Sequence, residues 1–188
     1  MGKPSAMRQR TLPDFLAPGL DIVSIGINPS VYSVEHGFYF ARPGNRFWPA
    51  LNASGLLPAP MTPSPEAVER LFREHRIGFT DLVKRATPRA ADLGEEDYRQ
   101  GARTLRRKLA RCAPVIAWFH GVSGYRLFLA HTETPRPTIA VGLQPQCIGT
   151  TRIFVTPNPS GANPSANPKQ LVPLYRELAR LRDQLTRP

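Results

Sequence analysis

Short apolar runs alternate with amphipathic stretches along this chain, and that alternation limits the possible folds more than any other feature of the sequence. Runs compatible with strands cover residues 20–27, 77–83, 115–119, 138–141 and 153–156; helical patterns begin at residue 46 and cover residues 65–75, 94–112, 123–130 and 169–185. Strands that alternate with helices are typical of a layered α/β domain with a mostly parallel sheet. We therefore predict an α/β fold, with residues 1–19 as a loose basic N-terminal arm and residues 20–188 as a single domain.

The helix predicted over residues 94–112 has the clearest pattern. Apolar side chains recur on one face, acidic residues fill the first turn and basic residues the last, as the helix dipole favours. Another face carries an i, i+4 ladder of arginines: Arg99, Arg103, Arg107 and Arg111. The ladder is either a solvated face or a track for phosphates. Between the helices, residues 31–45 are predicted to form one long aromatic-rich loop, and residues 57–65 a proline-rich linker.

Composition narrows the class of partner. The 188 residues carry a formal charge of +11, with 25 lysines and arginines, most of them arginine. Such a charge favours a polyanionic partner, nucleic acid first, because phosphate neutralisation releases counterions. An arginine-rich proteome would give the same charge without that partner.

Metal and membrane sites have no support in the sequence. Cys112 and Cys147 are too few for a disulfide framework or a cysteine-based metal site, and the four histidines lack metal-binding spacing. We predict that each histidine is a surface or turn residue. The N-terminus is polar and no apolar run approaches 18 residues, so we expect neither export nor a membrane span. The expected location is the cytoplasm, associated with the nucleoid.

The tripeptide Asn-Pro-Ser occurs twice, at residues 28–30 and 158–160, each time after a predicted strand. Ligands of open α/β sheets bind beyond the carboxyl ends of the parallel strands, so we expect the two copies to flank one site. Asparagine offers both a donor and an acceptor without charge, which suits a binding cleft. Ordinary turn chemistry would explain either copy alone.

Six short motifs occur in order between residues 12 and 185. They are Leu-Pro-Asp at 12–14, Gly-Ile-Asn-Pro at 26–29, Gly-Phe-Tyr-Phe-Ala-Arg-Pro at 37–43, Asn-Arg-Phe-Trp at 45–48, Gly-Phe-Thr-Asp-Leu-Val at 78–83 and Asn-Pro-Ser-Gly at 158–161. Together they resemble the mismatch-specific uracil-DNA and thymine-DNA glycosylases. The resemblance implies a three-layer α/β/α fold around a short parallel sheet, no cofactor, and hydrolysis of the bond between a damaged pyrimidine and deoxyribose. It also implies double-stranded DNA containing uracil or a mismatched pyrimidine as the partner, and a protein that acts as a monomer.

Such an enzyme must flip the nucleotide out of the helix and hold its base in a pocket. Phe40 is predicted to stack on the base, with a core role as the alternative. By resemblance, the rest of the pocket is made by Ile27, Ser30, Ser33 and Asn158.

Two residues are the catalytic candidates. By resemblance, Asn28 orients the attacking water, although an amide cannot take its proton at neutral pH. Asp81 is the candidate carboxylate that stabilises the oxocarbenium-like sugar and accepts that proton. Asp81 could instead cap a turn, and Asp92 is the second candidate acid.

Residues 158–163 match the loop that enters the minor groove in this family. Its predicted DNA contacts are Ser160, Gly161, Ala162 and Asn163, and Ala162 stands where relatives place a bulky wedge. Arg46 is also predicted to contact DNA. A cation in the first turn of a helix interacts unfavourably with the helix dipole, and a phosphate partner would remove that penalty.

A non-catalytic nucleic-acid-binding module is the alternative function, since it would share the charge and the aromatic loop. A nucleotide-handling α/β enzyme is disfavoured because no glycine-rich phosphate loop is present in the sequence.

Overall fold

The computed structural model of the chain describes residues 11–133 and 138–187. Its centre is a five-stranded sheet in the order β2-β1-β3-β5-β4. Four strands run parallel: β1 (Ile22–Gly26), β2 (Ile77–Asp81), β3 (Ile116–His120) and β5 (Thr151–Thr156). The fifth, β4 (Gly142–Ile148), pairs antiparallel with β5 at one edge of the sheet.

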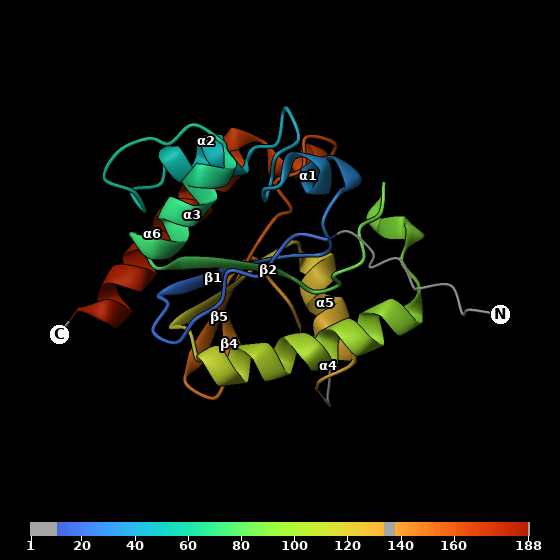
Figure 1. Cartoon of the computed structure of the whole chain (residues 1–188). Coiled ribbons are helices and arrows are strands. Elements are labelled where there is room, and N and C mark those ends of the chain that lie inside the picture. The colour runs from blue at the N-terminus through green and yellow to red at the C-terminus, as the bar shows by residue number, and fades with distance from the viewer. Residues whose placement is uncertain (1–10, 134–137, 188) are drawn as a thin grey trace.

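Helices cover both faces of this sheet, as Figure 1 shows. One face carries α2 (Phe47–Asn52), α3 (Pro65–Arg73) and α6 (Pro168–Thr186), and the other carries α4 (Glu95–Cys112) and α5 (Val122–Ala130). A short helix, α1 (Val31–His36), lies beyond the end of β1, and 3₁₀ turns span Ala90–Asp92 and Pro164–Ala166. The predicted three-layer α/β/α fold with a mostly parallel sheet is confirmed.

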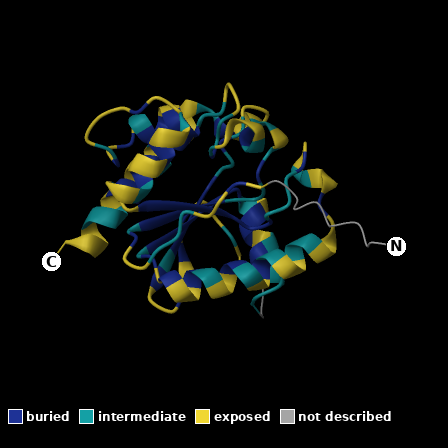
Figure 2. Cartoon of the chain, in the orientation of Figure 1, coloured by how far each residue is buried: buried dark blue, intermediate teal, exposed yellow. Residues whose placement is uncertain are grey.

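Burial on both faces explains why the parallel strands are continuous apolar runs in the sequence. Neighbouring side chains of one strand enter opposite layers: Ile22 belongs to the α2, α3 and α6 side, and Val23 to the α4 and α5 side. The strands are accordingly the darkest part of Figure 2, where buried residues are dark blue.

The helix α4 agrees with its predicted pattern, since Ala102, Leu105, Leu109 and Cys112 are buried. Gly101 lets it approach the sheet closely. A Cβ at this position would come within 2.3 Å of the Leu82 carbonyl oxygen.

Two predictions about secondary structure are wrong. Residues 31–36 form the helix α1 rather than part of a long loop, because the Ser30 hydroxyl caps it by accepting from the Ser33 amide at 3.1 Å. The predicted strand 138–141 is not a strand, and the edge strand follows it as β4. In β4 only Gly142, Gln144 and Ile148 are buried, while Leu143, Pro145 and Cys147 are exposed, so the strand has no continuous apolar run.

The predicted arm is not loose in its second half. Residues 1–10 lie outside the described residues, but Leu12 is buried and Phe15 pairs with Phe79 of β2 through two backbone hydrogen bonds of 2.9 and 3.0 Å. Gly78 permits this contact, since a Cβ there would come within 2.3 Å of the Phe15 carbonyl oxygen. The apolar residues of this segment therefore make it part of the folded domain.

Candidate active site

A cavity of about 330 Å³ opens where the parallel strands end. Asn28 follows β1, Asp81 ends β2, His120 ends β3 and Asn158 follows β5, and all four line its wall. The carboxyl ends of parallel strands meet at one edge, which brings residues distant in sequence to this space. The predicted convergence of the two Asn-Pro-Ser copies is confirmed.

Most of the predicted site residues share this wall. Besides Asn28 and Asp81, it contains Ile27, Ser30, Ser33, Phe40, Asn158, Ser160 and Ala162. Arg46, Gly161 and Asn163 are not in the wall and support its loops instead.

Asn28 is held by its amide nitrogen. Nδ2 donates to the Arg85 carbonyl at 3.0 Å and to Thr87 Oγ1 at 2.6 Å, with a longer bond of 3.4 Å to the Pro29 carbonyl. A carbonyl only accepts, so the nitrogen must face this loop and Oδ1 remains an acceptor for another donor. The side chain is therefore oriented without using its oxygen.

Asp81 is a buried carboxylate, 4% exposed, and lies beside Gly26 in the sheet register. Oδ1 lies over Gly26, where a Cβ would come within 2.5 Å of it, so a side chain at position 26 would displace the carboxylate. Burial raises the pKa of Asp81 to about 6; Lys84 works against this shift and Asp14 adds to it. The group therefore titrates near neutral pH, as a proton acceptor in a reaction requires.

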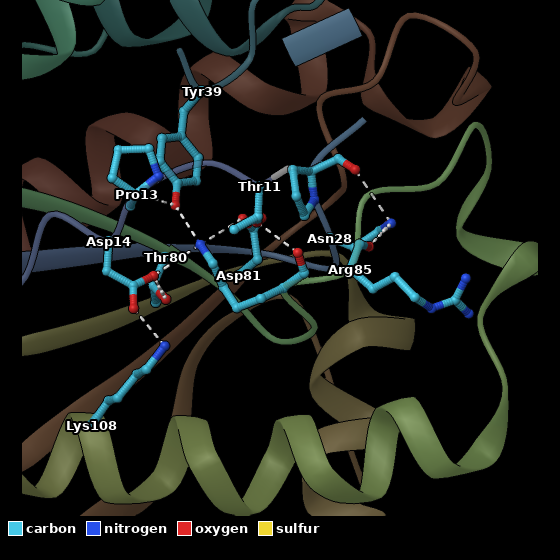
Figure 3. Close-up of polar contacts among 11 residues, drawn as sticks. Thr11, Pro13, Asp14, Asn28, Tyr39, Thr80, Asp81, Arg85 and Lys108 are labelled. Atoms are coloured by element: carbon cyan, nitrogen blue, oxygen red, sulfur yellow. Dashed lines mark hydrogen bonds and ion pairs between the residues drawn. The ribbon is translucent and has the colours of Figure 1, made fainter. Parts of the chain in front are cut away.

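A cluster of charges lies behind Asp81 (Figure 3). Lys84 Nζ is 2.9 Å from Asp14 Oδ1, donates to the Tyr39 hydroxyl at 3.1 Å, and is 3.6 Å from Asp81 Oδ2. Asp14 also pairs with Lys108 of α4. Burial alone would raise the pKa of Asp14, but Lys84 and Lys108 outweigh it and hold that pKa below its ordinary value.

Phe40 has a left-handed backbone with φ 57°, a conformation that is strained for a bulky residue and typical of functional sites. One face of its ring stacks on Phe47, with the ring centroids 4.0 Å apart and the planes 13° from parallel. The ring also lies 5.0 Å from that of His120, and it lines the cavity. A planar ligand could stack on the face that Phe47 leaves free.

Arg46 fastens the loop of residues 158–163. Its guanidinium donates to the carbonyls of Asn163, Gly161 and Ser160 at 2.8, 3.3 and 3.4 Å. These carbonyls give the guanidinium acceptors within the protein; the phosphate contact suggested by the sequence stays a prediction. Gly161 is needed because a Cβ there would come within 2.8 Å of the Gly44 carbonyl oxygen.

Asp92 lies outside the cavity wall. Its carboxylate bonds the side chain and the backbone amide of Arg89, and the Arg89 side chain holds the pKa of Asp92 below its ordinary value. Within the described residues, Asp81 is the only carboxylate that lines the cavity.

Among the residues of the cavity wall that were not predicted, His120 and Thr87 matter most for the site. His120 is 2% exposed and not a surface residue: its Nε2 lies 2.8 Å from Ser24 Oγ, and burial lowers its pKa to about 3, so the ring is neutral. A single polar residue at the end of an apolar run is the signal that could have identified it. Thr87, the hydroxyl partner of Asn28, follows β2 in a loop whose path the sequence does not predict.

Metal ligands and membrane-spanning helices were sought in the described part of the chain. There, no three histidine, cysteine or acidic side chains gather as metal ligands would, and no helix has the length and apolarity to cross a bilayer.

Two comparisons with known proteins concern the fold and the family of this chain. A solution NMR structure of a candidate uracil DNA glycosylase from Methanosarcina acetivorans has the same fold, with a TM-score of 0.55 and 21% identity, over 90% of this chain and 98% of that one. The family model described as the uracil DNA glycosylase superfamily matches residues 13–179. This chain therefore belongs to the uracil DNA glycosylase superfamily.

Proposed function

We propose that this protein is a monofunctional DNA glycosylase of the mismatch-specific uracil/thymine type. It flips uracil, or a related damaged or mismatched pyrimidine, out of double-stranded DNA and hydrolyses the N-glycosidic bond as a monomer. The observation that carries the proposal is one cavity lined by an oriented amide, Asn28, a buried carboxylate, Asp81, and an aromatic ring, Phe40.

Asn28 orients the attacking water molecule, and Asp81 accepts its proton. A water between them donates one hydrogen to Asn28 Oδ1 and the other to the carboxylate, which leaves an oxygen lone pair for C1′ of the sugar. The new C1′–O bond forms, the bond to the base breaks, and the base leaves with the electron pair while Asp81 takes the proton. The ionised Asp81 also stabilises the oxocarbenium-like charge on the sugar.

The base stacks on Phe40, a contact worth about 1–3 kcal/mol that tolerates different bases. Asn158 Oδ1 accepts from the Ser160 amide at 3.1 Å, so its amide nitrogen is free to donate to an oxygen of the base. Ser30 and Ser33 are small and bond each other at 3.0 Å, which leaves room beside the 5-position of a pyrimidine.

The loop of residues 158–163 enters the minor groove next to the vacated position. Ala162 lines the cavity and fills little of the gap that the flipped nucleotide leaves. We therefore expect weak retention of the abasic product.

Release of uracil from a G·U duplex, measured with a chelator present and followed by alkaline cleavage, tests the proposal. We expect uracil release without added metal, and a single-turnover rate about 100-fold lower for Asn28→Ala. Binding of this variant to a non-cleavable duplex should stay within about threefold of the unmodified protein. Absence of base release, or dependence on metal, would reject the proposal.

The same assay separates the glycosylase from a non-catalytic nucleic-acid-binding module. Such a module would bind duplex DNA equally well with and without Asn28→Ala, and neither protein would release a base. Duplexes with thymine or other pyrimidines, and with other opposite bases, then define the substrate range.

A further inference from the structure

Lys84 does not line the cavity that we assign to the flipped nucleobase. It does form an ion pair with Asp81, the residue that we assign as the proton acceptor. It lines a second cavity of about 330 Å³ on the α4 side, and Asp81 lines both cavities. Asp81 therefore separates the space for the substrate from a space that contains Lys84.

The ammonium group of Lys84 is held in place by two partners. Of its three donors, one is directed at Asp14 Oδ1 at 2.9 Å and one at the Tyr39 hydroxyl at 3.1 Å. Tyr39 is fixed in turn, because its hydroxyl donates to the Pro13 carbonyl at 3.0 Å. The distance to Asp81 Oδ2 is 3.6 Å, which is an ion pair but longer than a hydrogen bond.

The two oxygens of Asp81 consequently have different surroundings. Oδ2 faces Lys84 and accepts no hydrogen bond within the described residues. Oδ1 lies over Gly26, which lines the base cavity. The positive charge thus acts from one side of the carboxylate while the other side faces the substrate.

Asp14 decides how close the ammonium group comes. Its carboxylate is anchored by Thr80, at 2.8 Å, and by Lys108, and the neighbouring Phe15 is paired with β2. Asp14 therefore holds Lys84 at the shorter distance and keeps it from closing on Asp81. A direct ion pair would favour the charged carboxylate more strongly and make it a poorer proton acceptor.

We propose that Lys84 is a positioning residue for Asp81: held by Asp14 and Tyr39, it keeps the carboxylate ionised while leaving Oδ1 open to accept a proton from water. The N-terminal segment that carries Asp14 is then part of the active site. This inference rests on the proposed function of Asp81 as the base.

Other charged groups near Asp81 do not replace Lys84. Arg85 is paired with Asp97 at 2.6 Å, and Lys108 reaches Asp14 rather than Asp81. Burial, with the carboxylates of Asp81 and Asp14, raises the pKa of Tyr39, so its hydroxyl stays protonated. His120, in the same cavity wall, is neutral.

The test is the pH dependence of the single-turnover rate on a G·U duplex. In the unmodified protein the rate should fall on the acid side through about pH 6. Lys84→Met should move that limb upward by about one pH unit or more, so that the rate at pH 6 drops about fivefold or more while the rate at pH 9 stays within about threefold. Lys84→Gln repeats the test with a polar side chain should the methionine variant fail to fold.

Asp14→Asn and Lys108→Met give the matched comparisons. Asp14→Asn frees Lys84 to close on Asp81, so its acid limb should move to lower pH and its plateau should fall by about threefold to tenfold. Lys108→Met removes an ion pair with Asp14 and none with Asp81. It should move the acid limb of the pH profile by less than about half a pH unit. If Lys84→Met and Lys108→Met have the same pH profile, the inference is rejected.

Carbon-13 NMR titration of the Asp81 carboxyl group separates this inference from the proposed function, because it needs no activity. A higher carboxyl pKa in Lys84→Met supports the role of Lys84, even where the rate does not follow it; that combination would reject Asp81 as the base. An unchanged carboxyl pKa rejects the role of Lys84, whatever the activity of the protein.

Discussion

At the scale of single residues, the raised pKa of Asp81 affects both the proposed reaction and the stability of the fold. Its pKa is raised from 3.8 to about 6 by burial, so between these values the folded protein binds more protons than the unfolded chain. Stability therefore falls as the pH rises through this window and stays reduced above it. A carboxylate kept in such a place is an example of stability given up at a functional site.

Asp81→Asn should consequently make the protein more stable and less active. We expect the free energy of unfolding at pH 7.5 to rise by about 1–3 kcal/mol, while the single-turnover rate falls about 100-fold or more. At pH 4 the gain in stability should largely vanish, because Asp81 is then protonated in the folded protein. Urea unfolding of both proteins at the two pH values measures this difference in the free energy of unfolding.

Asp92→Asn is the matched control, since the pKa of this exposed acid is shifted in the opposite direction. It should bring no gain in stability at pH 7.5 and leave the rate within about threefold. A less stable Asp81→Asn protein at pH 7.5 would contradict the assigned cause of the Asp81 shift.

Thr87 gives a second prediction at this scale. Its hydroxyl accepts from Asn28 Nδ2 and donates to the Arg89 carbonyl at 2.8 Å. Thr87→Val keeps the shape but removes both bonds, so we expect a loss of about 1–3 kcal/mol in stability and about tenfold or more in the single-turnover rate. Thr87→Ser retains the hydroxyl and should keep most of the activity; equal rates for the two variants would show that the orientation of Asn28 does not depend on Thr87.

At the scale of elements, the loop of residues 158–163 is shaped by a partner from another part of the chain. Arg46 precedes α2, and besides the three carbonyls that its side chain binds, its backbone amide donates to the Pro159 carbonyl at 2.9 Å. Gly161 and Gly44 bring the two loops into backbone contact. These contacts hold the loop in place without DNA, so the DNA contact that we propose for this loop should cost less ordering entropy.

Arg46→Met should weaken DNA binding without changing its dependence on salt, because the side chain acts through the loop and not on a phosphate. We expect affinity for a non-cleavable duplex to fall about threefold to tenfold with an unchanged slope of log affinity against log salt. Arg42→Met is the matched variant, since Arg42 is exposed at the cavity wall. Its slope should fall by about 0.9, the value for one lost phosphate contact; the same reduction in Arg46→Met would restore Arg46 as a phosphate contact.

At the scale of the whole molecule, we expect the carboxyl edge of the sheet to face the DNA. The carboxyl ends of the four parallel strands lie at this edge. The helix α4 runs from the end of β2 back to the start of β3. The last turns of α4 therefore lie at the opposite edge of the sheet from the cavity (Figure 1). The net charge of +11 attracts a polyanion to the whole protein, whereas the cavity that contains Asn28 and Asp81 lies at the carboxyl edge.

A salt titration of duplex binding tests this orientation. We expect log affinity to fall by at least about 3 for each unit of log salt in the unmodified protein. The double variant Arg107→Glu with Arg111→Glu, at the far end of α4, should leave the slope within about 0.5 of that value. A slope that is smaller in magnitude by about two would instead indicate that the arginine ladder binds phosphates.

The sequence by itself determined the class and order of most elements and the meeting of Asn28 with Asn158. Buried strands and amphipathic helices are local patterns, and the ends of parallel strands must share an edge. It failed for α1 and β4, because a six-residue helix and a one-sided edge strand leave weak periodic signals.

Tertiary structure alone decided which groups surround the candidate site residues. Asp14, Tyr39 and Lys84 come from three separate segments, and nothing in their local sequence indicates that they meet behind Asp81. The partner of Arg46 and the burial of His120 likewise depend on contacts between distant residues. Local patterns follow from neighbours along the chain, whereas the pKa and the hydrogen bonds of a buried side chain follow from whatever the fold places beside it.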